Sequence, residues 1–138
     1  MSDANKTTLG RLVDEAFGKG NLAVVDEVIA NDFVDHNPPP NTPSDKAGLK
    51  ETVKMFRSAF PDLKLTIEDA IAEGDKVAIR LVTRGTHKGA FFGIAPTGRS
   101  VTVNEQHIVR FAGGKIAEHW GVEDNLGMMQ QLGVIPTH

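Results

Sequence analysis

The chain has 138 residues, and its 15 basic and 18 acidic side chains leave a formal net charge of −3 with histidine neutral. This length suits one domain with a single core, and 40% hydrophobic with 24% charged residues is a globular composition. Cysteine is absent, which excludes disulfide frameworks, thiolate metal sites and thiol nucleophiles. The slightly acidic balance argues against a nucleic-acid partner.

Membrane association is not expected from the sequence. No apolar run approaches the roughly 18 to 20 residues that a membrane span needs. Residues 1–8 are polar and lack the apolar core of a secretion signal. The sequence therefore predicts a soluble, cytoplasmic protein without a membrane partner, organised as one domain over residues 1–138.

The N-terminal half carries three helical patterns. Apolar residues recur at the spacing of one helix face in residues 9–17, 22–29 and 44–60. Ser44 is the predicted N-cap of the third helix, and Pro61 ends it. The three consecutive prolines 38–40 cannot lie inside a helix, so they predict a stiff loop between the second and third helices.

From residue 63 onward the apolar spacing changes to alternation, which is typical of strands with one buried face. The predicted strands cover residues 63–68, 77–84, 101–111 and 115–123, and a short helix follows at 126–132. Helices followed by hairpin-linked strands predict an α+β fold, with three N-terminal helices packed on a curved, mainly antiparallel sheet. A small-molecule pocket would lie between the sheet and the helices.

Glu105 and His107 are unusual because the other positions of the same strand face are apolar. A polar pair on such a face must be hydrogen-bonded, line a wet cavity, or lie where the face leaves the core. One interpretation is a structural histidine that is buried and braced by its neighbour. The other is a functional pair that opens into the pocket.

Asp124 follows the last strand and shares the parity of Trp120, so a straight strand would point both side chains into the same interior. A carboxyl group enclosed there could take up a proton and return it. Asp124 also directly precedes the terminal helix, for which it is a natural N-cap. The two roles are compatible.

Three further polar residues have open interpretations. His36 and Asn37 either contact a ligand carbonyl from the pocket rim or satisfy the turn into the prolines. His119 has the parity opposite to Trp120 and is expected in solvent or at an interface. A metal site would need His36, His107 and His119 to converge, and His107 and His119 are expected to point in opposite directions, so no metal is predicted.

Motifs for common cofactors and nucleophiles are absent from the sequence. There is no dinucleotide-binding glycine fingerprint, no phosphate-binding P-loop and no Gly-x-Ser-x-Gly elbow. Tyrosine is also absent, which removes the phenol that some proton-abstracting enzymes use as an oxyanion donor. No cofactor is therefore expected.

Several segments occur together in the order of a known family. They are Phe33–Pro38, Phe60–Leu63, Gly93–Arg99, Arg110–Phe111 with Gly114–Ile116, Glu118–Trp120 with Asp124, and Gln131–Gly133. Together they resemble the SnoaL-like polyketide cyclases (ester cyclases), a branch of the nuclear transport factor 2-like superfamily. The resemblance covers about Leu9 to Gly133. It implies a cone-shaped α+β barrel with a deep pocket, usually in a homodimer.

The resemblance also implies cofactor-independent acid/base chemistry on a small carbonyl compound. In the family's cyclases an aspartate near the end of the final strand acts as acid and base, and a strand histidine supports it. The matching residues here are Asp124 and His107, as the catalytic pair. The substrate-binding residues expected beside them are His36, Asn37, Glu105, Trp120, Phe33 and Phe56. The lack of tyrosine departs from a pocket built for large aromatic polyketides.

Three functions stay open on the sequence. In an aldol-type cyclase, an enolate would close a ring on a second carbonyl, and Asp124 would protonate the alkoxide. A related isomerase, dehydratase or epoxide hydrolase would use the same fold. A non-catalytic ligand-binding or dimerisation module is the third, because a fold does not fix a function. Val82 and Ile108 on the outer sheet face are the expected dimer contacts.

Overall fold

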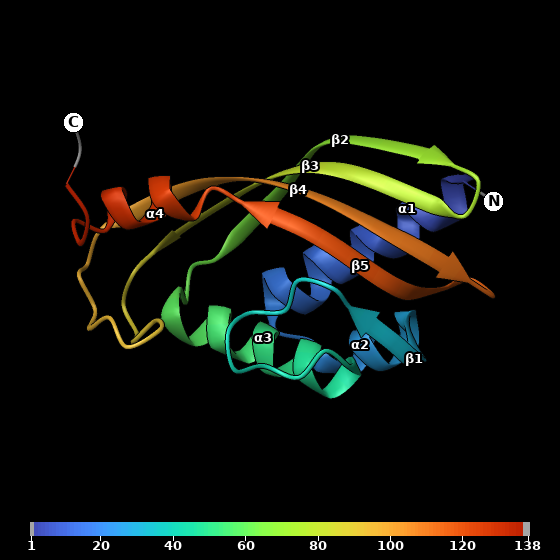
Figure 1. Cartoon of the computed structure of the whole chain (residues 1–138), viewed down its shortest axis with the longest axis horizontal. Helices are drawn as coiled ribbons and strands as arrows, with labels where there is room; N and C mark the ends of the chain where they lie inside the picture. Colours follow the sequence, from blue (N-terminus) through green and yellow to red (C-terminus); the bar gives the residue numbers. More distant parts are fainter. Residues whose placement is uncertain (1, 137–138) are drawn as a thin grey trace.

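The chain folds as a bent five-stranded sheet that carries helices on one face, as the computed structural model shows for residues 2–136 (Figure 1). The helical elements are α1 (Ser2–Arg11), the π-helical segment η1 (Leu12–Phe17), α2 (Leu22–Val28), α3 (Lys46–Ala59) and α4 (Asn125–Gln131). The strands are β1 (Ile29–Asp35), β2 (Lys64–Glu73), β3 (Lys76–Thr86), β4 (Ser100–Ala112) and β5 (Lys115–Glu123). The predicted α+β class is confirmed.

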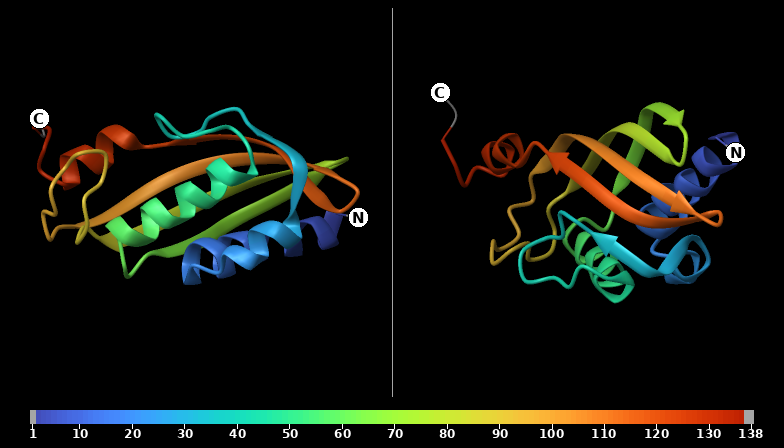
Figure 2. Two further views of the ribbon diagram at one scale, coloured as in Figure 1. Left: turned by 90° about the horizontal axis from the view of Figure 1, so that it is seen from below. Right: turned by 45° about the vertical axis from the view of Figure 1, so that its right-hand side comes forward.

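The strand order in the sheet is β1-β5-β4-β3-β2. Neighbours pair antiparallel except β1, which pairs parallel with β5 and brings Asp35 opposite His119. The sheet arches over α3 and over the N-terminal helices (Figure 2). Strand β1 is not among the predicted strands, because its sequence mixes polar and apolar residues without the alternation that marks the other strands.

Two helix starts differ from the prediction. The first helix begins at Ser2, ahead of the apolar stripe, and becomes π-helical at Leu12. The third helix is capped by Asp45 and not by Ser44: the Asp45 side chain accepts a hydrogen bond from the Gly48 backbone N–H at 2.9 Å. Asp124 caps α4, as its position before that helix predicted. In the described residues, no helix has the length and apolar character to cross a membrane.

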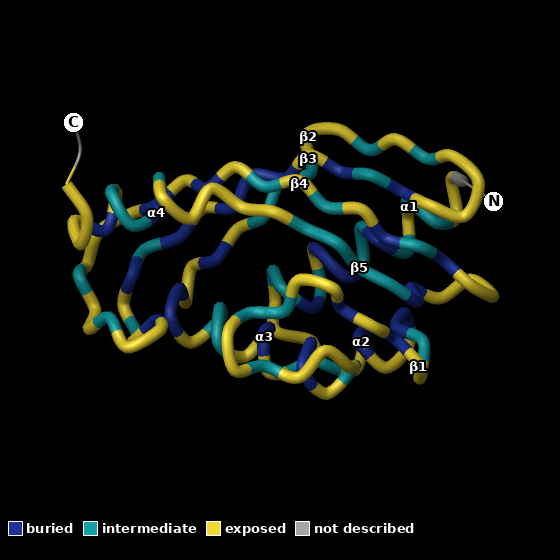
Figure 3. The backbone as a smooth tube through the Cα atoms, viewed as in Figure 1, coloured by how far each residue is buried: buried dark blue, intermediate teal, exposed yellow. Residues whose placement is uncertain are grey.

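Buried positions recur along the strands and the helices of the chain (Figure 3). The core consists of two apolar clusters. One joins α1, η1 and α2 to strand residues such as Val77, Val109 and Ile116. The other joins the end of α3 to Phe91, Val101 and α4. Residues of both clusters line a cavity between the sheet and the helices.

A bulge in β5 decides which of its side chains face the cavity. Phe111 on β4 pairs with Ile116, but the preceding Arg110 pairs with Glu118, so Ala117 is an extra residue in the ladder. One extra residue inverts the inside–outside alternation of everything that follows it. Beyond the bulge, His119 therefore faces the cavity and Trp120 faces outward, which reverses the prediction made for a straight strand.

Candidate active site

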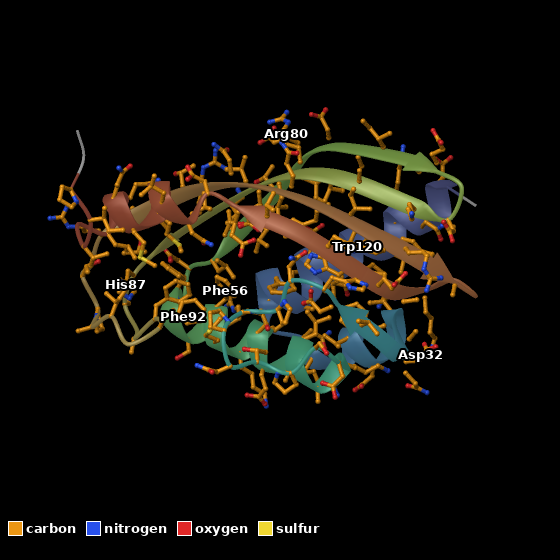
Figure 4. The ribbon with its side chains drawn as sticks, viewed as in Figure 1. Asp32, Phe56, Arg80, His87, Phe92 and Trp120 are labelled. Carbon is orange, nitrogen blue, oxygen red and sulfur yellow. The ribbon has the colours of Figure 1, made fainter. Side chains whose placement is uncertain are left out.

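The cavity has a volume of about 660 Å³ and mostly apolar walls, to which α3 and the strands contribute side chains such as Phe56 and Leu81. Its polar residues include Asp35, Asn37, Glu105, His107, His119 and Glu123. The exposed residues among its lining define its mouth: Asn37, Pro40, Asn41, Phe92, Glu123 and Asn125. Phe56 and Phe92 lie beneath one half of the sheet, and Trp120 lies toward the other half (Figure 4).

Four side chains from β1, β5 and β4 form a continuous hydrogen-bonded chain, here called the histidine relay: Asp35, His119, His107 and Glu105. Asp35 Oδ1 lies 2.8 Å from His119 Nδ1, and His119 Nε2 lies 2.8 Å from His107 Nδ1. His107 Nε2 lies 2.8 Å from Glu105 Oε1. Glu105 and His107 are thus both hydrogen-bonded and on the cavity wall, and the expected opposite orientation of His107 and His119 is wrong.

The histidine relay holds one proton more than two neutral imidazoles carry. Its three hydrogen bonds need three hydrogens, and two neutral imidazoles supply two. The third resides on one of the imidazoles, giving an imidazolium, or on Glu105 at the cavity end. Shifting hydrogens across the His119–His107 and His107–Glu105 bonds moves this proton toward the cavity without moving a heavy atom. The arrangement can therefore accept and release a proton at the cavity.

Asp35 anchors the buried end of the histidine relay. Burial alone would raise the pKa of its carboxyl group, but the hydrogen bond from His119 and the charge of that ring outweigh it. The backbone N–H of Asn37 donates to the same carboxylate at 2.9 Å. The net result is a lowered pKa for Asp35, so this residue stays an anion and His119 Nδ1 donates to it.

Glu123 provides a second carboxyl group beside the cavity end of the histidine relay. It is opposite Glu105 in the β4–β5 ladder, and ligand atoms of Glu105, His107 and Glu123 all lie within 4.8 Å of one another. Partial removal of its carboxyl group from water raises the pKa of Glu123, and the negative charge of the neighbouring Glu105 raises it further. A raised pKa favours the protonated form of the Glu123 carboxyl group, which can donate a proton. The bulge that turns it inward was not foreseen from the sequence.

Gly121 makes the contact between the two histidines possible. It lies opposite His107 in the ladder, and a Cβ atom there would lie 2.3 Å from His107 Nδ1 and 2.8 Å from His119 Nε2. Both distances are far shorter than any van der Waals contact. The side-chain-free position thus leaves room for the hydrogen bond between the imidazoles.

The other predicted site residues divide between the cavity and the outside. Phe33, Phe56 and Asn37 line the cavity, and Asn37 Oδ1 accepts a hydrogen bond from the Gly121 backbone N–H at 3.0 Å. His36 and Trp120 are not part of the cavity lining. Their rings stack on each other at a centroid distance of 4.8 Å, and His36 Nε2 lies 3.1 Å from Glu118.

Asp124 is placed differently from the expectation. Its side chain is exposed and accepts a hydrogen bond from the Gly127 N–H at 2.9 Å, which caps α4. It does not line the cavity beside His107. The expected projection of Asp124 into the interior followed from the parity of a straight strand, and the bulge at Ala117 gives the inward position to Glu123 instead.

Glu105, His107 and Glu123 are also the residues that could hold a metal ion, because their ligand atoms lie close together. Two carboxylates and one imidazole are a ligand set that divalent cations accept. A cation bound by all three would have to replace the hydrogen bond between His107 and Glu105.

Comparison with known proteins identifies the family. SnoaL-like polyketide cyclase is the family that matches, over residues 7–132. The chain is 33% identical over 122 residues to the nogalonic acid methyl ester cyclase of Streptomyces nogalater. The match covers 86% of this chain and 90% of that protein. It is 30% identical over 131 residues to the aklanonic acid methyl ester cyclase DauD of Streptomyces sp. (strain C5), covering 91% of this chain and 80% of the relative.

Solved structures agree with this assignment. IdmH of Streptomyces antibioticus has a TM-score of 0.82 and 39% identity, over 94% of this chain and 99% of its own. TsrD of Streptomyces laurentii has a TM-score of 0.90 and 26% identity, over 98% of both chains. The resemblance noted in the sequence is thereby confirmed: this chain belongs to the SnoaL-like polyketide cyclase family.

Proposed function

We propose that this chain is a cofactor-independent cyclase, which closes a ring in a polyketide-derived keto ester by intramolecular aldol-type attack. The observation that carries the proposal is the histidine relay, which opens together with Glu123 into an apolar cavity. Family membership supports it, since relatives are named as methyl ester cyclases.

The chemistry needs one proton to leave carbon and one to reach oxygen. Glu105, backed by His107, takes the proton from a carbon flanked by two carbonyls, and the C–H electron pair becomes an enolate. The enolate carbon bonds to a second carbonyl carbon, whose π electrons move to oxygen. Glu123 protonates that alkoxide, and the proton held by the histidine relay returns to Glu123. The product has the same mass as the substrate, and the enzyme is restored.

The cavity walls supply the remaining catalytic effect. An open-chain diketone has many conformations, and only folded ones bring the enolate carbon near the second carbonyl. Enclosure by apolar side chains selects folded conformers and excludes the water that would compete for the enolate. A carbon acid between two carbonyls is already acidic, so one acid/base system suffices.

The proposal assigns the acid role to Glu123, whereas the family resemblance points to Asp124. Two facts favour Glu123: it faces the cavity next to Glu105, and its pKa is raised. Asp124 is engaged as the cap of α4. His107 keeps the supporting role expected from the sequence.

The test compares Glu123→Gln with Asp124→Asn, using aklanonic and nogalonic acid methyl esters as candidate substrates. Loss of a participating acid should lower kcat by about 10²- to 10⁴-fold in Glu123→Gln, whereas Asp124→Asn should lower it by less than about threefold. Mass spectrometry of the product is the second readout. A larger loss in Asp124→Asn would contradict the assignment, and a product that differs by one water would favour a dehydratase or hydrolase.

Thermal stability separates chemistry from misfolding in Glu123→Gln. A carboxyl group with a raised pKa in the folded state stabilises the fold fully below its ordinary value of 4.5 and loses that contribution as pH rises through the folded value. At neutral pH its ionisation opposes folding. The glutamine variant should therefore melt no lower than the parent at pH 7, while its activity falls.

We also propose that two copies associate through the outer face of the sheet. Ile71, Ile108 and Val122 are 69%, 43% and 68% exposed, and neighbouring Trp120 is partly exposed. Val82, an expected contact, is buried within the chain. Light scattering should give twice the chain mass of 14.9 kDa, and a mass of one chain at all concentrations would contradict the dimer. The cytoplasmic location stays a prediction.

A further inference from the structure

We infer that Phe92 is a specificity-determining residue, whose ring stacks on a flat, conjugated part of the substrate at the mouth of the cavity. The identity of the substrate in this inference comes from the proposed function. The binding role of the ring is argued from the geometry of Phe92 alone.

Phe92 holds a backbone conformation that its side chain disfavours. Phe91 and Ile94 exchange two backbone hydrogen bonds, of 3.0 and 2.9 Å, and enclose a turn of two residues, Phe92 and Gly93. The φ angles of these residues are +48° and +79°, as in a type I′ turn. Asn-Gly is the pair that such a turn favours, because a bulky side chain at positive φ is strained. The turn alone therefore does not explain a phenylalanine.

The exposure of Phe92 to water is a second feature that is unfavourable for the stability of the folded protein. Phe92 is 44% exposed although it belongs to the cavity lining. Its inner neighbour Phe91 is 1% exposed and lies against Phe60 and Phe56 at centroid distances of 5.3 and 5.5 Å. The Phe92 ring lies 4.5 Å from the Phe91 ring and extends this aromatic cluster to the mouth.

A ligand in the cavity would remove this exposure. Phe92 and Phe56, both labelled in Figure 4, each contact the Phe91 ring, and both line the cavity. An aromatic face favours a planar, electron-delocalised partner in offset or edge-to-face contact. The carbonyl groups of such a partner would then be available to the histidine relay and Glu123, which are among the polar groups that line the same cavity. The predicted ligand class is a conjugated ring system that carries a carbonyl-rich chain.

The decisive variant is Phe92→Asn, which improves the turn and removes the ring. Its melting temperature should rise by about 3 °C, because the strain is relieved. Its Kd for 1,8-dihydroxyanthraquinone, measured by fluorescence titration, should rise about tenfold. Its KM for the methyl ester substrate should rise by a similar factor. Phe92→Tyr keeps both ring and strain and should stay within about twofold of the parent Kd. Val134→Asn removes an apolar side chain of similar exposure, 46%, that does not line the cavity, and is the control.

The outcomes separate this inference from the proposed function. A lower melting temperature with unchanged Kd in Phe92→Asn would show that the ring only packs, and would overturn the inference. Failure of the parent to bind the anthraquinone would overturn it too. Ester turnover with unchanged KM in Phe92→Asn would refute the role of Phe92 alone. A Phe92-dependent Kd in a protein that cyclises no ester would support the role of Phe92 and refute the cyclase function.

Discussion

Two histidine–carboxylate pairs lie on opposite faces of β5, and their surroundings differ. On the cavity face, His119 and Asp35 are 2.8 Å apart, with side chains 20% and 9% exposed. On the outer face, His36 and Glu118 are 3.1 Å apart and 38% and 26% exposed. The inner pair continues through His107 to Glu105, whereas the outer pair ends against Arg110 and the ring of Trp120.

The difference shows that connection, and not residue type, marks the candidate site. An exposed ion pair is screened by water and contributes little to stability or to proton transfer. In a partly enclosed network, each hydrogen bond polarises the next, and a proton has a continuous path. Substitutions on the two faces of β5 should therefore have very different effects on activity.

The largest effect is expected for His107→Gln. Glutamine cannot carry the extra proton of the histidine relay, and both ring hydrogen bonds are lost, so kcat should fall by about 10²- to 10⁴-fold. Steady-state kinetics with the methyl esters would measure the loss, and circular dichroism would check the fold. Retention of more than about a third of the activity would exclude His107 from proton transfer.

Gly121→Ala should come next, because it leaves every titratable group of the histidine relay in place. The added Cβ would lie 2.3 Å from His107 Nδ1 and must push the imidazoles apart. A displacement of about 1 Å in a catalytic group costs about 10²-fold in rate. Gly10→Ala is a matched control, because a Cβ there meets nothing within 4 Å and alanine favours the helix. Equal activity of the two variants would disprove the role of the His107–His119 contact.

Asp35→Asn should reveal itself in the pH dependence of stability. The pKa of Asp35 is lowered in the folded state, so its contribution is complete above the ordinary value of 3.8 and is lost as pH falls through the folded value. The variant should be about 1–3 kcal/mol less stable at pH 7, with a smaller further loss on acidification. Urea unfolding at pH 7 and pH 3 measures both. Parallel stability curves for parent and variant would contradict a lowered pKa.

The smallest effect is expected for His36→Gln on the outer face. The variant loses an exposed pair and the stacking on Trp120, so stability should change by less than about 1 kcal/mol and kcat by less than about twofold. Thermal melts and steady-state kinetics would measure these changes. A loss of activity comparable to that of His107→Gln would mean that the outer pair also belongs to the site.

The sequence was sufficient for the α+β class, the strand β5 with its bounds, the cap of α4 and the polar pair Glu105–His107. It was insufficient to predict which side chains of β5 face the cavity, because the alternating pattern does not show that one residue is inserted as a bulge. The consecutive apolar residues Ile116 and Ala117 were the one available signal of the bulge. With a straight strand, Trp120 replaces His119 in the predicted pocket, and Asp124 replaces Glu123.

The roles of Asp35 and Phe92 could not be predicted from the sequence for other reasons. Asp35 meets His119 only because β1 pairs parallel with β5, and long-range pairing is not written in the local pattern of either strand. Phe92 precedes a glycine in a loop, and only the φ angle of the folded chain shows the strain. In both cases the missing information is tertiary.

The pairing of β1 with β5 has a consequence for how the protein matures. Asp35 and His119 are separated by 84 positions, and β1 occupies one edge of the sheet. The β-hairpin ladders β2–β3, β3–β4 and β4–β5 join near neighbours in the chain, whereas docking of β1 must close a long loop. Nascent or refolding molecules should thus display native-like hairpins before they acquire turnover, and catalytic competence becomes a late marker of completed folding.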